Sequence, residues 1–253
     1  LPPCHECKKI LQLSSVPQSG GTCCCFEGFR KLQYVEDPTK GPNQHKTRLS
    51  CVGYLDPLKD PKPSDSELWR PNPSELTESL TEDIALLFLQ KLGDIFANMI
   101  TDEKQMDDNY RKAGKQVIWK RPHPGVREMC DVCTTSIFNY HFTCGTCGFL
   151  VCIDCFNGRK RGTRYKTLGM MAKPYRTHKN RFNKNLDKNL WPICAEKKSH
   201  ELDLLLLTHM SPGSVPMEIV DEMHELRKTL GIKAECKCCQ KEEDVSNMVD
   251  SST

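Results

Sequence analysis

The sequence predicts an α+β fold built from small cysteine-rich modules. Three observations support it: six cysteines form three Cys-x-x-Cys pairs within residues 130–155, one long amphipathic segment begins near residue 81, and several short apolar segments end at turn residues. The chain has 253 residues, of which 38% are hydrophobic, so it can hold one large or two small domains with apolar cores. The 16 cysteines indicate that bonds to sulfur stabilise these modules.

The N-terminal segment, residues 1–56, is cysteine-rich and is predicted to contain two short strands. Residues 29–35 are followed by Asp37-Pro38, and residues 49–55 alternate loosely before Asp56-Pro57. Asp-Pro pairs are turn signals that close strands. We therefore expect two short strands that end at these turns.

Residues 57–125 are predicted to form a Pro-rich connector followed by an amphipathic helix. Five prolines between residues 57 and 73 exclude regular structure in the connector. Ser79 with Glu82 three residues later has the form of a capping box, and the apolar residues that follow recur at helical spacing. We expect a helix over residues 81–106 that packs on a small sheet. Its apolar face comprises Ile84, Leu87, Phe88, Leu92, Ile95, Phe96 and Met99.

Three further elements follow from apolar patterning. Residues 115–119 are predicted to form a short strand, and the apolar run at residues 202–207 a buried strand or helix. The C-terminal segment, residues 211–253, is expected to hold a helix over residues 217–230, a cysteine cluster and a polar tail. Gly231 is the stop signal of that helix.

The charge of the chain is distributed unevenly. The net charge is +3, but Arg159 to Lys188 contains eleven Lys or Arg residues and one acid, so this segment carries +10 and the remainder −7. Such asymmetry indicates an electrostatic partner such as nucleic acid. A solvated basic linker, or a nuclear import signal at Arg159-Lys160-Arg161, is the alternative.

The ends and the apolar runs bear on localisation. The longest apolar runs, residues 84–89 and 204–207, are far shorter than the roughly 20 residues that span a bilayer, so we expect no membrane-spanning segment. The first residue is Leu1, and no signal-peptide pattern opens the sequence. We therefore expect a fragment of a longer, intracellular protein.

The three Cys-x-x-Cys pairs indicate metal centres. Each pair can wrap a tight turn round one ion, and two pairs supply the four soft ligands of a tetrahedral zinc. Six thiols fill one such site and leave two, so two more ligands must come from elsewhere. Disulfides are the alternative, but the clustering and the lack of a secretion signal favour Zn²⁺. The pairs are Cys130/Cys133, Cys144/Cys147 and Cys152/Cys155.

His141 is a further candidate ligand between the first and second pairs. In a RING finger one to three residues separate a cysteine from the histidine that follows it, and the corresponding positions 137–139 are Ile, Phe and Asn. That absence argues against a RING-type ubiquitin ligase. The aromatic neighbours Tyr140 and Phe142 favour a strand in which His141 packs or forms a hydrogen bond.

The spacing of the pairs resembles the ZZ type of cross-braced zinc finger. In that family the first and third pairs share one zinc, and the middle pair shares a second zinc with two later ligands. The resemblance implies one finger over residues 126–210, with a basic insertion at 157–189 that is far longer than the ZZ loop. One late ligand is also Cys where the ZZ pattern has His. The implied first site is Cys130, Cys133, Cys152 and Cys155. The implied second site is Cys144, Cys147, Cys194 and His200.

A third zinc site is predicted near the N-terminus. Cys4, Cys7 and one member of the Cys23-Cys24-Cys25 run supply three ligands, and Cys24 is preferred within the run. The other two thiols of a run are commonly buried as small hydrophobes. The fourth ligand stays open among Cys51, His45, Cys236 and Cys238.

Several strings together resemble one family over nearly the whole chain. They resemble the region upstream of the catalytic domain in Jumonji (JmjC) histone demethylases of the lysine demethylase 3 subgroup, which are related to the hairless corepressor. The strings are Phe29-Arg-Lys-Leu-Gln-Tyr34, Val117-Ile-Trp-Lys120, Gly125-Val-Arg-Glu-Met-Cys-Asp-Val-Cys133, Cys147-Gly-Phe-Leu-Val-Cys-Ile-Asp-Cys155 and Gly231-Ile-Lys-Ala-Glu-Cys-Lys-Cys238.

This resemblance implies a nuclear chromatin regulator whose expected partners are the histone H3 tail or DNA, contacted through the basic segment 159–188. The family removes methyl groups from lysine nine of histone H3 as dioxygenases that use Fe(II) and 2-oxoglutarate. Their iron is held by a His-x-Asp/Glu motif, and none of the eight histidines here has Asp or Glu two residues later. The chain is therefore expected to scaffold a catalytic domain without being catalytic itself.

Two other functions remain open from the sequence. One is a ubiquitin ligase of RING type. The other is a pure protein-interaction finger, for which Leu202-x-x-Leu205-Leu206 matches a nuclear-receptor box. Contacts with a second copy of the protein are a further expectation.

Overall fold

The computed structural model describes residues 28–36, 47–70, 80–122, 127–162, 191–194 and 198–240. The chain divides into two compact units, each of which is discontinuous in sequence. Unit 1 comprises Leu1–Asp60 and Gln116–Met210, and unit 2 comprises Pro61–Lys115 and Ser211–Thr253. The four segments expected from the sequence are consecutive ranges, whereas each unit joins two separate stretches.

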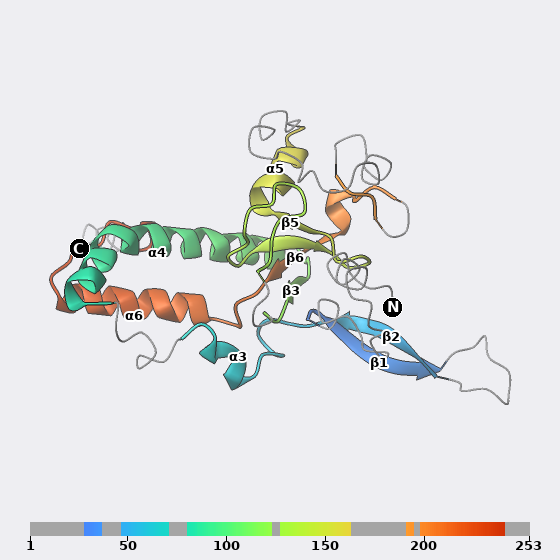
Figure 1. The fold of residues 1–253 in the computed structure, drawn as a ribbon, viewed down its shortest axis with the longest axis horizontal. Helices are drawn as coiled ribbons and strands as arrows, with labels where there is room; N and C mark the ends of the chain where they lie inside the picture. The colour runs from blue at the N-terminus through green and yellow to red at the C-terminus, as the bar shows by residue number, and fades with distance from the viewer. Residues whose placement is uncertain are drawn as a thin grey trace, which may run out of the picture. The chain divides into compact units, whose positions relative to one another are not determined.

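A four-stranded sheet forms the centre of unit 1 (Figure 1). Its spatial order is β3 (Val117–Trp119), β6 (Leu205–His209), β4 (His141–Cys144) and β5 (Leu150–Cys152). β3 runs parallel to β6, and the other two pairs are antiparallel. The predicted strand at 115–119 and the apolar run at 202–207 are thus neighbours in one sheet.

Large side chains bury both faces of this sheet. Trp119 is fully buried, and its Nε1 donates to the carbonyl of Met210 at 2.9 Å. Phe142 stacks on Phe156 of α5 (Ile153–Lys160) with 3.6 Å between ring centroids. The stacking contact fixes α5 against the β4–β5 hairpin, and these elements carry four of the predicted metal ligands.

A two-stranded antiparallel ribbon completes the described part of unit 1. β1 (Arg30–Glu36) pairs with β2 (Thr47–Tyr54), and a register shift occurs between Lys31 and Leu32. The amide of Leu55 donates to the carbonyl of Phe29 at 2.9 Å. Both strands predicted in the N-terminal segment are confirmed.

The Pro-rich connector contains a short helix, α3 (Pro63–Glu67), so the prediction that it lacks regular structure is wrong. Pro63 occupies the first turn, where a missing N–H costs nothing because that group has no partner within a helix. The carboxylate of Asp65 accepts from the Lys62 amide at 2.8 Å and closes the N-terminus.

The long amphipathic helix is α4 (Glu82–Lys112), which ends six residues beyond the predicted 81–106. Its N-cap is Thr81, whose hydroxyl accepts from the Ile84 amide at 3.4 Å, while Ser79 lies outside the described residues. Apolar periodicity stops before the last turns, where ion pairs at four-residue spacing continue the helix. These pairs are Lys104–Asp108 at 2.9 Å and Arg111–Asp107 at 2.9 Å.

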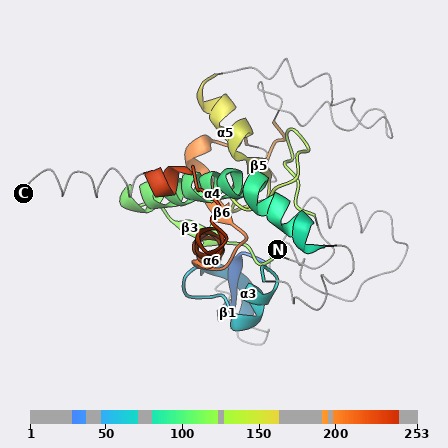
Figure 2. The ribbon, with the colours of Figure 1, turned by 90° about the vertical axis from the view of Figure 1, so that its left-hand side faces the viewer.

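Within unit 2, α4 packs along α6 (Val215–Thr229), as Figures 1 and 2 show. A side chain at Gly93 would lie 3.0 Å from the guanidinium of Arg227, so the absence of a Cβ permits this close approach. The sequence predicts a helix that packs on a sheet, whereas the partner of α4 in its own unit is a helix. α6 matches the predicted helix at 217–230, and the predicted stop signal Gly231 follows its C-cap, Leu230, with a φ of 65°.

A stripe of large apolar side chains on α4 is exposed. The helix is long and apolar enough to cross a membrane by length and composition, with an 18-residue window of mean hydropathy 1.4. One such helix is weak evidence for a membrane span. The lengths of uninterrupted apolar runs did not indicate a membrane span here, because Lys91 and Asp94 interrupt the apolar sequence of this helix. The exposed stripe comprises Ile84, Leu87, Phe88, Leu92, Ile95 and Met99.

Candidate metal centres

Three groups of Cys and His side chains converge in the described part of the chain, and within each group the four ligand atoms lie within 4.8 Å of one another. Clusters 1 and 2 lie in unit 1, and cluster 3 lies in unit 2. Cluster 1 comprises Cys130, Cys133, Cys152 and Cys155. Cluster 2 comprises Cys144, Cys147, Cys194 and His200. Cluster 3 comprises His224, Cys236, Cys238 and Cys239.

Cluster 1 joins a tight turn to the start of α5. Cys130 and Cys133 flank a turn whose Asp131 is tied to β5: its amide donates to the Leu150 carbonyl, and its carboxylate accepts from the Leu150 amide, both at 2.8 Å. Cys152 is the N-cap of α5, and its Sγ lies 3.7 Å from Sγ of Cys133. The two pairs predicted to share one ion therefore face each other.

The thiols of cluster 1 share charge unequally. Hydrogen bonds from the thiols of Cys152 and Cys155 lower the pKa of Cys130 to about 2. Because Cys152 and Cys155 donate to Cys130, the pKa of Cys152 is raised to about 12 and that of Cys155 is raised also. A divalent cation would allow all four sulfurs to be thiolates, which is the form that binds zinc.

Cluster 2 joins the β4–β5 turn to two residues from beyond the basic insertion. Cys144 ends β4, and its Sγ lies 4.0 Å from Sγ of Cys194. Sγ of Cys147 lies 3.1 Å from Nε2 of His200. A hydrogen bond from the Cys147 thiol lowers the pKa of Cys144 to about 3, and the pKa of Cys147 is raised in return.

The imidazole of His200 is oriented for metal binding. Its Nδ1 lies 2.8 Å from the carbonyl of Pro192, which can only accept, so Nδ1 carries the proton and Nε2 keeps its lone pair toward Cys147. The ring also stacks on Phe149, with 4.2 Å between ring centroids. A carbonyl that fixes the tautomer is the usual outer support of a histidine ligand.

A buried cation lies beside cluster 2. The guanidinium of Arg30, from β1, donates to the carbonyls of Gly145 and Thr146 within the Cys144–Cys147 turn, the second at 3.0 Å. A zinc with three thiolates and one imidazole carries a net charge of −1. Arg30 is placed to balance that charge, because it interacts electrostatically with Cys144 and Cys147.

The two Cys-x-x-Cys turns share one backbone pattern. The amide of Cys130 donates to the Thr135 carbonyl and that of Thr134 to the Cys130 carbonyl, at 2.9 and 2.8 Å. In the same way, the amide of Cys144 donates to the Phe149 carbonyl at 2.8 Å, and that of Gly148 donates to the Cys144 carbonyl at 2.9 Å. The residue after each turn has a positive φ: 61° for Thr134 and 73° for Gly148. A β-branched residue is strained in this region, whereas glycine is not.

Thr134→Gly is expected to stabilise unit 1 by about 0.5–1 kcal/mol. A left-handed conformation costs a non-glycine residue roughly 1–2 kcal/mol, and the greater freedom of glycine in the unfolded chain offsets part of the gain. The reciprocal change, Gly148→Thr, is expected to destabilise by about 1–2 kcal/mol. Denaturant unfolding of the zinc-saturated proteins measures both. A loss of stability in Thr134→Gly would contradict the assignment of strain.

His141 lies in β4 and belongs to none of the clusters found among the described residues. It is 0% exposed, and its Nδ1 lies 2.9 Å from the carbonyl of Asn139. Its Nε2 is buried without a hydrogen-bond partner. Burial, assisted by the charge of Lys120, lowers the pKa of His141 to about 3. The packed, hydrogen-bonded histidine predicted as the alternative to a ligand is what the structure contains.

Acidification is expected to destabilise unit 1 partly through His141. Its pKa is about 3 in the fold and 6.5 in the unfolded chain, so protons favour unfolding and this stability is lost as pH falls from 6.5 toward 3. Between pH 7.5 and pH 5 the wild type should lose about 2 kcal/mol more than His141→Gln. Denaturant unfolding of the zinc-saturated proteins at several pH values measures the difference. Parallel stability curves would show that His141 is not held neutral.

The remaining predicted ligands fall into two groups. Cys4, Cys7, Cys24 and His45 lie outside the described residues. Cys51 lies in β2, where its thiol donates to the carbonyl of Gly53 at 3.2 Å, and it joins none of the described clusters.

Cluster 3 was not predicted, and it takes up two cysteines that had been considered for the N-terminal site. Cys236 and Cys238 lie with Cys239 and His224 of α6. The sequence does contain a signal, because Cys236 and Cys239 form a fifth Cys-x-x-Cys pair, after Cys4/Cys7 and the three pairs of residues 130–155, that the intervening Cys238 obscures. His224 gives no comparable signal, since it is one polar residue of a helix.

Two other predicted features have defined positions. Leu205 and Leu206 of the receptor-box match lie in β6, an interior strand of the sheet, and Leu205 is buried. A receptor-binding helix at this motif would require that strand to leave the sheet. Of the basic segment 159–188, the structure describes only residues 159–162. Within these, the guanidinium of Arg159 lies over the Trp191 ring, 4.1 Å from the ring centroid.

The fold and the clusters define a mixed helix and sheet protein region whose Cys and His groups could each bind zinc. The chain is 33% identical over 254 residues to lysine-specific demethylase 3A of Mus musculus, which covers 96% of the chain and 16% of that protein. It is 30% identical over 246 residues to lysine-specific demethylase 3 of Drosophila melanogaster, covering 94% of the chain and 27% of that protein.

A human relative carries the JmjC name. The chain is 30% identical over 245 residues to "Probable JmjC domain-containing histone demethylation protein 2C" of Homo sapiens, covering 94% of the chain and 8% of that protein. The chain thus spans a minor part of these relatives, of which two are named lysine-specific demethylases and one a probable histone demethylation protein. No family model matches the chain, and no solved structure matches it.

Proposed function

We propose that the chain is the zinc-binding, non-catalytic region of a nuclear histone H3 lysine-nine demethylase, a JmjC oxidoreductase that regulates transcription. The observation that carries this proposal is the interleaving of clusters 1 and 2 in a chain similar to lysine demethylases along 96% of its length. Fe(II) and 2-oxoglutarate would serve the catalytic domain of the parent protein.

The two clusters support a ZZ-like cross-brace in unit 1. The first and third Cys-x-x-Cys pairs form cluster 1, and the second pair forms cluster 2 with Cys194 and His200. Closed four-ligand sites without carboxylates or an open position are typical of structural zinc. Two ions would therefore fix the β4–β5 hairpin and α5 as a rigid support for the rest of the protein.

Metal analysis of the purified chain, combined with cysteine mapping, tests the zinc sites. Before chelation, N-ethylmaleimide should leave the cysteines of clusters 1 and 2 unmodified, and after chelation it should modify all seven. At least two zinc ions per chain are expected. Immediate modification would show that these cysteines are free thiols, and protection that only a reductant removes would show that they form disulfides. Either result would contradict the proposal.

The chromatin role has its own test. The basic segment 159–188 is proposed to contact DNA or the histone H3 tail in chromatin. Its contacts with DNA phosphate should weaken steeply with salt. DNA and nucleosome binding should be titrated with salt for the whole chain and for a variant that lacks residues 163–190. Equal affinity of the two proteins would remove the nucleic-acid role.

Enzyme assays separate this proposal from a ubiquitin ligase. The full-length protein should demethylate lysine nine of histone H3 in the presence of Fe(II) and 2-oxoglutarate, and the 253-residue chain alone should not. Autoubiquitination by the chain with a conjugating enzyme would instead support a RING-like ligase.

A further inference from the structure

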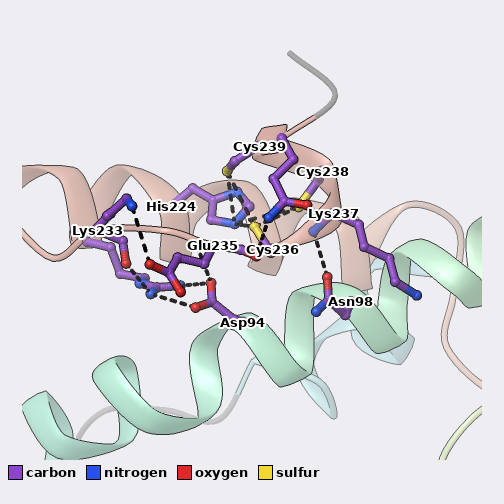
Figure 3. Close-up of polar contacts among 11 residues, drawn as sticks. Asp94, Asn98, His224, Lys233, Glu235, Cys236, Lys237, Cys238 and Cys239 are labelled. Atoms are coloured by element: carbon purple, nitrogen blue, oxygen red, sulfur yellow. Dashed lines mark hydrogen bonds and ion pairs between the residues drawn. The ribbon is translucent and has the colours of Figure 1, made fainter. Parts of the chain in front are cut away.

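Cluster 3 brings four ligand atoms together in unit 2 (Figure 3). Nε2 of His224 lies 3.2 Å from Sγ of Cys236 and 3.8 Å from Sγ of both Cys238 and Cys239. Sγ of Cys236 lies 3.0 Å from that of Cys238 and 3.4 Å from that of Cys239. Ligands that share a zinc at about 2.3 Å lie roughly 3.5–3.8 Å apart, so this spacing is close to what a tetrahedral ion requires.

Side chains of α4 hold the cysteine segment in position. Oδ1 of Asp94 accepts from the amide of Glu235 at 3.0 Å, and Oδ1 of Asn98 accepts from the amide of Lys237 at 2.7 Å (Figure 3). The two acceptors are four residues apart and thus share one face of the helix. The segment is therefore anchored by its backbone on both sides of Cys236.

Cys236 is oriented by packing as well as by these anchors. It is 0% exposed and packs with Ala97 and Ile100 of α4 and Val220 of α6. A lone buried thiol usually behaves as a small hydrophobe. Here the sulfur also faces the imidazole of His224 and two further thiols, which an apolar role does not require.

The local geometry repeats that of cluster 1. In Cys152-x-x-Cys155 the amide of the second cysteine donates to Sγ of the first at 3.4 Å, at the start of α5. In Cys236-x-x-Cys239 the first cysteine also stands directly before a helical turn, residues 237–240, and the Cys239 backbone lowers the pKa of the Cys236 thiol. The same pairing of thiols with a helix start thus occurs in both units.

We propose that cluster 3 is a structural zinc site of the Cys₃His type that clamps residues 232–240 onto α4 and α6. Four ligands from two parts of the chain close the site, which is the arrangement of structural zinc and leaves no position for a substrate. The resulting charge of −1 lies near the buried guanidinium of Arg227, which interacts electrostatically with Cys236 and Cys239. The site is independent of clusters 1 and 2, because it lies in the other unit.

Cysteine mapping of the zinc-loaded whole chain tests this site. Cys238 and Cys239 are only partly buried, so burial alone would not prevent their reaction with N-ethylmaleimide. All three cysteines should stay unmodified until a chelator is added and then react together. Reaction before chelation, or protection that persists until a reductant is added, would overturn the proposal.

Variants give a second measurement. His224→Gln and Cys239→Ser should each lower the zinc content by one ion per chain and speed hydrogen exchange at the amides of Glu235 and Lys237. The control Glu225→Gln, at the exposed neighbour of His224 on α6, should keep the wild-type zinc content. Unchanged zinc content in both ligand variants would overturn the proposal that cluster 3 binds zinc. Protection of the cysteines of clusters 1 and 2 is scored on separate peptides, so failure here is distinguishable from failure of the proposed function.

Discussion

Cys152→Ser is expected to release zinc from cluster 1 and to unfold unit 1. A structural zinc contributes roughly 10–16 kcal/mol of apparent binding free energy to folding, more than the 5–15 kcal/mol by which whole domains are stable. The substitution is informative because Cys152 is also the N-cap of α5, where serine is a favoured residue. Unfolding would therefore reflect the lost thiolate and not a lost cap.

Tryptophan fluorescence and zinc content measure this outcome. Two of the three tryptophans, Trp119 and Trp191, are buried in unit 1 at 0% and 1% exposure, so their emission should shift to the red. Cys51→Ser is the matched control, since Cys51 lies in the same unit but in none of the described clusters, and serine can keep its hydrogen bond to Gly53. Native emission and full zinc content in Cys152→Ser would show that cluster 1 holds no structural ion.

Asp94→Ala is expected to destabilise unit 2 by about 3 kcal/mol or more, because removal of one partner of a buried ion pair leaves an uncompensated charge. Arg227 is 1% exposed, and its guanidinium donates to both carboxylate oxygens of Asp94, at 2.6 and 3.3 Å. The variant also loses the anchor of the Glu235 amide. Chemical denaturation followed by circular dichroism measures the loss.

The same helix supplies a matched control. Asp102 lies on the face of Asp94 and pairs with Lys237 at 2.7 Å, but both side chains are more than half exposed. Asp102→Ala should therefore cost less than about 1 kcal/mol. The hydrogen bond from Arg227 lowers the pKa of Asp94, so the pair should stabilise the fold above pH 3.8 and lose that effect at lower pH. Equal losses of unfolding free energy in Asp94→Ala and Asp102→Ala would contradict the claim that the Arg227–Asp94 ion pair stabilises unit 2 more than the exposed pair does.

Sequence patterns were sufficient where the signal is local. Strands next to turn residues and the helix that precedes Gly231 were located from a few neighbouring residues. The grouping of Cys130 with Cys152, and of Cys144 with His200, came from a resemblance in spacing, and the structure places these residues together. Whether ions occupy the groups remains a prediction.

Features that depend on contacts between distant segments could not be predicted from local sequence patterns. His224 meets Cys236 because Asp94 and Asn98 set the path of the cysteine segment along α4, and neither residue type indicates a metal site. Unit 1 joins two separate stretches because the amide of Trp119 donates to the carbonyl of Leu55 at 2.9 Å, and unit 2 does so because α4 packs along α6. The final turns of α4 depend on ion pairs, which an apolar periodicity does not register.

Arg159 contacts Trp191, so the residues on the two sides of the stretch between Gly162 and Trp191 lie close together. Loop-closure entropy rises only by about 0.6 kcal/mol for each doubling of length. The number of residues in this stretch can therefore change during evolution with little effect on the fold. The length and the charge of this stretch can both vary while Cys194 and His200 stay grouped with Cys144 and Cys147.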